Sequence, residues 1–272
     1  MRSLLLAVVA LLCLPAQALA EVELSVGFSD PEFIAYFRQA ILARPLSGHD
    51  GQPGPIAKFG GPIKLLIVNN TDEDDAALAP LYDQAKRVVA EIGQAAGLGV
   101  EITTLSDQAS QASVLRAVKN SNLVLIFGLI PFFDMDDPAS AQKYDIVVKN
   151  RQLITPCKAD ECESAVMLEI QETRKIGVSM LKVEASDPVY ARAAIAEGLL
   201  RAVSDAAAVD ASYPSVLGWH REAPFDRPGL SRMDRLMLRV LYDPRLTPPL
   251  TPPEIEALLP AVLADAKAAA GG

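Results

Sequence analysis

Few side chains in this chain have the chemistry that catalysis or metal binding needs. Its 272 residues include two histidines, His49 and His220, and three cysteines. A catalytic zinc site takes histidines and carboxylates that the fold brings together. Both histidines lie in loop-like stretches far apart in the sequence, and their spacing does not indicate that the fold brings them together with carboxylates. We therefore predict no metal site and no bound cofactor.

A serine-based site can be composed from three residues near the C-terminus. Ser215, His220 and Asp234 are the residue types of a Ser-His-Asp triad, in which the histidine takes the proton of the serine. The G-x-S-x-G turn that exposes a nucleophilic serine is missing from this sequence. Ser215 and His220 therefore stay candidates for binding rather than for catalysis.

Aromatic residues gather in the same Pro-rich stretch, 213–228. Tyr213, Trp219 and Phe225 there have two interpretations. They line a groove for a small ligand, because aromatic loops favour contact surfaces, or they pack the loop onto neighbouring helices.

Three charged residues recur every fourth position in a predicted helix. Glu197, Arg201 and Asp205 have this spacing, which places them on one helix face. One interpretation is a solvated ladder, worth about 0.2 to 0.5 kcal/mol per pair. Glu197 and Arg201 also have a functional interpretation, which rests on a family resemblance.

The first twenty residues have the pattern of a signal peptide. Arg2 precedes an apolar run at 4–14 that is too short to cross a bilayer, and Ala18-Leu19-Ala20 is a small-x-small cleavage signature. We expect cleavage after Ala20, an exported product in the periplasm or outside the cell, and no transmembrane segment in it.

Removal of the signal peptide also removes Cys13 and leaves a pair, Cys157 and Cys162. In an oxidising compartment this C-x4-C pair predicts a local disulfide. The alternatives are a redox pair, for which C-x-x-C is the usual spacing, and a structural zinc, which needs four ligands.

The composition excludes some classes of protein and partner. Half of the residues are hydrophobic and 22% are charged, which excludes general disorder. The formal net charge of −9 gives no basic surface for nucleic acid. The expected partner is an unidentified envelope protein or a small molecule.

Helices and strands that must position these side chains alternate along the chain. The spacing predicts helices at 30–43, 72–96, 110–119, 139–148, 187–208, after Ser231 and after Thr251. It predicts strands at 64–68, 100–105, 123–127, 165–171 and 176–183, the last two as an antiparallel hairpin. This order predicts an α+β fold with a mixed sheet, flanking helices and a helical C-terminal part. We expect a signal peptide at 1–20, an N-terminal segment at 21–30, one domain at 31–268 and a flexible tail at 269–272.

Blocks in the C-terminal half resemble a bacterial family, domain of unknown function 2927. They are Ala-Ile-Ala-Glu at 194–197, Tyr-Pro-Ser-Val at 213–216, Leu-Ser-Arg-Met-Asp at 230–234 and Leu-Arg-Val-Leu-Tyr-Asp-Pro-Arg-Leu at 238–246. The resemblance covers the chain from about Phe33 to Leu259. It implies an exported protein with a fold similar to the zincin metallopeptidases, in which one helix carries H-E-x-x-H.

That motif binds a metal through histidines four residues apart on one helix face, and its glutamate is the general base. The corresponding helix here reads Ala-Ile-Ala-Glu-Gly-Leu-Leu-Arg at 194–201, without histidine. The resemblance implies a degenerate site, with Glu197 facing the former cleft and Arg201 in the place of the metal. We expect a non-catalytic envelope protein with a binding or structural role. The alternatives are a hydrolase that uses Glu197 and a ligand-binding protein that uses the 213–228 loop.

Overall fold

The computed structural model describes residues 27–43, 58–106, 109–128, 148–154, 165–170, 178–183, 188–218, 229–247 and 250–271. Several predictions concern residues outside these ranges. They are the signal peptide, the pair of Cys157 and Cys162, the loop residues His49, Trp219, His220 and Phe225, and nearly all of the expected helix at 139–148.

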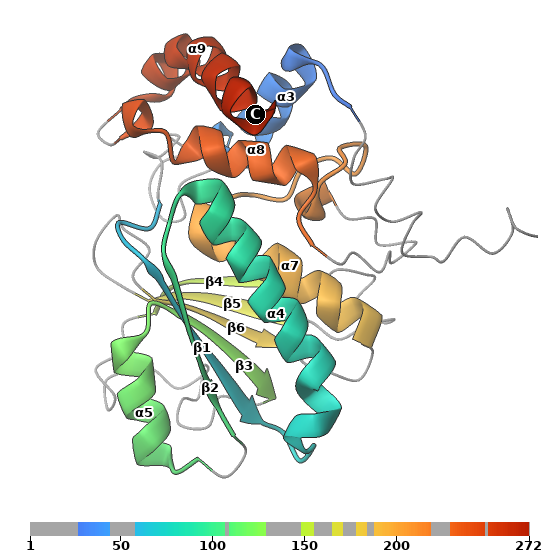
Figure 1. Cartoon of the computed structure of the whole chain (residues 1–272), viewed down its shortest axis with the longest axis vertical. Coiled ribbons are helices and arrows are strands. Elements are labelled where there is room, and N and C mark those ends of the chain that lie inside the picture. Colours follow the sequence, from blue (N-terminus) through green and yellow to red (C-terminus); the bar gives the residue numbers. More distant parts are fainter. Residues whose placement is uncertain are drawn as a thin grey trace, which may run out of the picture.

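A six-stranded mixed sheet lies at the centre, in the order β2-β1-β3-β6-β5-β4 (Figure 1). The strands are β1 (Ile63–Asn70), β2 (Val100–Leu105), β3 (Leu123–Gly128), β4 (Val148–Ile154), β5 (Ala165–Ile170) and β6 (Val178–Val183). From β2 to β6 the neighbours are parallel, and β5 is antiparallel to both β6 and β4. The mixed sheet and the predicted β5–β6 hairpin are confirmed. Strand β4 was not predicted, and it begins where the expected helix at 139–148 ends.

Helices surround the sheet and cover one end of it. They are α3 (Asp30–Phe37), the π-helical turn η1 (Arg38–Leu42), α4 (Asp75–Ala96), α5 (Gln111–Asn120), α7 (Pro188–Ser204), the 3-10 turn η2 (Val216–Gly218), α8 (Arg232–Leu241), the 3-10 turn η3 (Pro244–Leu246) and α9 (Pro252–Gly271). Helix α7 ends before the predicted residue 208, because Asp205 adopts a left-handed φ of 53°. Helix α9 continues to Gly271, into the segment expected as a tail.

Capping side chains set several of these helix ends. Ser29 and Ser231 each form a capping box, with Glu32 and Asp234 respectively, which satisfies backbone N–H groups at the start of α3 and α8. Gly97 ends α4 with a φ of 69°, a conformation that glycine adopts without strain.

The central strands β1 and β3 are buried on both faces of the sheet, whereas the edge strand β2 is largely exposed. Leu65, Ile67 and Leu125 belong to the main core, which α4, α7, α3, α8 and α9 share. The neighbouring residues Leu66 and Val124 are equally buried but lie outside that cluster, since side chains alternate across a strand. The sheet therefore has one large core face, and α7 lies on that face.

Figure 1 shows α3, α8 and α9 together at one end of the molecule, above α4 and α7. Within the described ranges, no helix has the length and apolar character that a membrane span requires.

Candidate functional site

Helix α7 is a core helix with a mostly apolar sequence and three charged residues, Arg192, Glu197 and Arg201. Every residue from Ala193 to Ser204 is buried. The helix packs against α4 on one side and against β5 and β6 on the other. A helix that is apolar around most of its circumference is typical of a protein interior. Its buried charged residues are Glu197 and Arg201.

Glu197 and Arg201 form a buried ion pair within this helix. The Nε atom of Arg201 lies 3.4 Å from Oε1 of Glu197, and the two side chains are 10% and 11% exposed. The prediction of a solvated ladder is therefore wrong, because α7 lies under other helices. Asp205 follows the last helical residue, has a left-handed φ of 53° and donates its N–H to the carbonyl of Arg201 at 2.7 Å.

The ion pair compensates the charge of Arg201 but leaves its Nε–H without a hydrogen bond among the described residues. A buried charge that loses its partner costs about 3 to 5 kcal/mol, so each residue here depends on the other. A general base must reach the proton that it removes. A glutamate that is nine-tenths covered and faces a fixed cation is poorly placed to do so.

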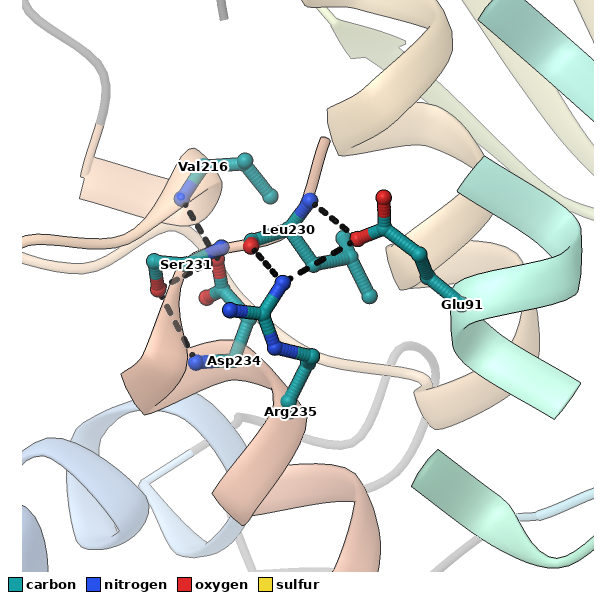
Figure 2. A network of polar contacts seen from close by, with 6 residues as sticks. All are labelled: Glu91, Val216, Leu230, Ser231, Asp234 and Arg235. Atoms are coloured by element: carbon teal, nitrogen blue, oxygen red, sulfur yellow. Dashed lines mark hydrogen bonds and ion pairs between the residues drawn. The ribbon is translucent and has the colours of Figure 1, made fainter. Parts of the chain in front are cut away.

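A second buried carboxylate, Asp234, lies at the start of α8 (Figure 2). Its Oδ1 accepts hydrogen bonds from Tyr36 Oη at 3.0 Å and Ser215 Oγ at 2.5 Å. Its Oδ2 accepts from Val216 N at 3.0 Å, Ser231 N at 3.0 Å and Ser231 Oγ at 2.7 Å. Five neutral donors therefore hold one carboxylate, and they come from α3, the 213–218 segment and the N-terminus of α8.

The same network fixes Ser215 in a way that differs from a catalytic triad. In a triad the imidazole lies between the serine and the carboxylate. Here Ser215 donates directly to Asp234, accepts from Leu217 N at 3.0 Å and is fully buried. Burial, with the Asp234 charge second, raises the pKa of Tyr36 well above its usual value, so this hydroxyl stays a donor. The structure brings Ser215 and Asp234 together as a structural network.

Tyr213 packs onto the same region. Its ring centroid lies 5.5 Å from that of Tyr36, and it is partly buried against the main core. This geometry favours the packing interpretation of the aromatic loop for Tyr213. Trp219 and His220 lie outside the described residues.

A polar junction between α4 and α8 was not predicted from the sequence (Figure 2). Glu91 on α4 accepts from Leu230 N at 2.9 Å and pairs with Arg235 at 3.3 Å, and Arg235 donates to the Leu230 carbonyl at 2.6 Å. A Cβ atom on Gly229 would lie 2.4 Å from Oε1 of Glu91, so the glycine permits this close approach. The one sequence signal for this junction is Glu91, an acidic residue next to the apolar stripe of α4.

In the described part of the chain, no three residues of the types His, Cys, Asp and Glu converge as a metal site would require. Comparisons with family models, curated proteins and solved structures found no match to this chain.

Proposed function

We propose that this chain is an exported, non-catalytic protein whose zincin-like domain has a binding or structural role in the cell envelope. One observation carries the proposal. Glu197 and Arg201 have the same four-residue spacing as the metal-binding histidines of H-E-x-x-H, and they form an ion pair with each other. In this proposal, the guanidinium of Arg201 lies on the helix face that holds the metal ion in a peptidase.

The arrangement of the elements supports the zincin-like part of this proposal. The resemblance implies a mixed sheet with helices, one of which carries the site. Helix α7 follows the last strand, β6, and packs on the large core face beside α4. The Glu197 position thus lies on a helix of the kind that the resemblance implies.

The hydrolase alternative requires an accessible Glu197 with a reacting group beside it. The side chain is 11% exposed and pairs with Arg201, which argues against this role. The alternative of a ligand-binding 213–228 loop has no support from Tyr213, which packs on Tyr36.

Metal content and hydrolysis test the proposal on the mature protein. Elemental mass spectrometry should find less than about a tenth of an equivalent of zinc per protein. In hydrolysis assays, the protein should cleave a panel of peptide and ester substrates no faster than a denatured control does. Glu197→Gln should leave both results unchanged. Stoichiometric zinc that is lost together with peptidase activity in His49→Ala or His220→Ala would overturn the proposal.

A further inference from the structure

A cavity of about 400 Å³ lies between α8, α9 and the segment that precedes α3. Its wall includes Phe28, Arg232, Arg235, Leu236, Arg239 and Lys267. This volume is in the range of pockets that bind small molecules. The cavity is lined by residues other than those of the α7 ion pair, so a role for it is independent of the proposed function.

Four cations converge on this cavity in a protein whose formal net charge is −9. Arg232, Arg235 and Arg239 are three and four residues apart on α8, which places them on one helix face. Lys267 reaches the same cavity from α9. Like charges gathered in this way repel one another unless an anion compensates them.

Carboxylates of the protein neutralise only part of this charge. Arg235 pairs with Glu91 at 3.3 Å, and Lys267 pairs with Asp30. Arg232 and Arg239 have no carboxylate partner within ion-pair distance among the residues that the structure describes. Four cations and two carboxylates leave a formal surplus of two positive charges.

The cavity also has an apolar wall. The Arg232 guanidinium lies 6.0 Å and the Lys267 ammonium 5.7 Å from the ring centroid of Phe28. Leu236 is buried beside them. An aromatic ring that contacts cations at the edge of a pocket can also contact a planar part of a ligand.

We propose that this cavity binds a small molecule that carries a phosphate monoester and a planar or apolar group. A phosphate monoester carries about −1.5 to −2 charges at neutral pH, which matches the surplus of two. The guanidinium forks of Arg232 and Arg239 suit phosphate oxygens, because they donate two parallel hydrogen bonds. Phe28 and Leu236 receive the apolar part of the ligand.

Calorimetric titration with phenyl phosphate tests this site, with inorganic phosphate, phenol and citrate as comparison ligands. We expect phenyl phosphate to bind more tightly than the other three. The double variant Arg232→Gln with Arg239→Gln should weaken binding at least tenfold. Lys86→Gln with Arg116→Gln changes the charge equally on α4 and α5, away from the cavity, and should leave binding unchanged.

Phe28→Leu tests the apolar wall of the cavity independently of its cationic residues. It should reduce the preference for phenyl phosphate over inorganic phosphate and leave the affinity for inorganic phosphate within twofold. The proposal is overturned if wild-type protein does not bind phenyl phosphate, if both double variants bind equally, or if citrate binds as tightly. Binding only to vesicles of phosphatidic acid, without binding of the soluble phosphates, would also overturn it, because the source of the phosphate would then be a lipid surface.

Discussion

Two buried carboxylates in this protein are stabilised in opposite ways. Asp234 is fully buried and accepts hydrogen bonds from five neutral donors on three separate segments. The Glu197 side chain is 11% exposed and forms an ion pair with Arg201 within the same helix. The first arrangement fixes the positions of segments that are far apart in sequence. The second compensates a charge inside one helix.

This difference separates residues that specify the fold from residues that we propose to be the remains of a former site. Tyr36 and Ser215 reach Asp234 from 198 and 19 residues away in sequence, so their contacts hold α3 and the 213–218 segment on α8. The Glu197–Arg201 pair spans a single turn that helix formation already brings together. We interpret its burial as a consequence of where α7 lies in the fold.

The largest expected effect comes from the Asp234 network. Asp234→Asn removes the charge and places amide donors against backbone donors, so we expect a loss of about 3 to 5 kcal/mol in the free energy of unfolding. Urea denaturation measures this loss. Asp243→Asn is the matched control, since Asp243 is partly exposed and pairs with Arg245. A loss below about 1 kcal/mol for Asp234→Asn would mean that the network does not hold the segments.

Glu91 is an intermediate case, because it joins two segments as Asp234 does and pairs with a cation as Glu197 does. Gly229→Ala places a methyl group where Glu91 now lies and displaces its carboxylate from Leu230 N. We expect a loss of about 1 to 2 kcal/mol, the cost of a buried donor without a partner. Gly61→Ala has open space around its Cβ and is the control. Equal thermal stability of Gly229→Ala and Gly61→Ala would contradict the close contact between Gly229 and Glu91.

A smaller effect should follow when one donor to Asp234 is removed. Tyr36→Phe keeps the ring packing and leaves four donors on the carboxylate. We expect a loss of about 1 kcal/mol, the usual contribution of one hydrogen bond. The same urea titration measures it, with Tyr242→Phe for comparison, at a partly buried tyrosine whose hydroxyl donates to the Val203 carbonyl. A loss as large as that of Asp234→Asn would show that Tyr36 alone carries the network.

The smallest expected effect is on the stability of the protein at acidic pH. A side-chain hydrogen bond from Arg245 lowers the pKa of Asp243 below its ordinary value of 3.8. Because the folded-state pKa is depressed, this contribution is present above pH 3.8 and is lost as the pH falls through the lower folded-state value. Asp243→Asn should therefore flatten the pH dependence of stability below about pH 4. An unchanged profile in thermal unfolding at about pH 2 to 5 would contradict this assignment.

Sequence patterns predicted the elements that local chemistry controls. The capping box at Ser231 and the helix end at Gly97 follow from cap residues, and the β5–β6 hairpin follows from the alternation of apolar residues in its strands. Strand β4 was missed because its sequence, Val-Lys-Asn-Arg-Gln-Leu-Ile, has polar residues in the middle. Long-range pairing with β5 decides its structure, and no local pattern shows that pairing.

The candidate site was harder to predict for the same reason. A glutamate and an arginine four residues apart are typical of exposed helices, and only the packing of α7 between α4 and the sheet buries this pair. The three arginines of α8 are visible in the sequence as one helix face. Their meeting with Lys267 and Phe28 depends on how α9 and the segment before α3 pack.

A double-mutant cycle on Glu197 and Arg201 tests the central claim most directly. The claim is that the two opposite charges neutralise each other and do not serve a catalytic or metal-binding site. Glu197→Leu and Arg201→Met should each cost about 3 kcal/mol in urea denaturation, because each removes the ion-pair partner of a buried charge. The double variant should lie within about 1 kcal/mol of wild type, since an apolar pair of similar volume replaces the ion pair. Additive losses in the double variant would contradict the account, because they would show that each residue has its own partner and its own role.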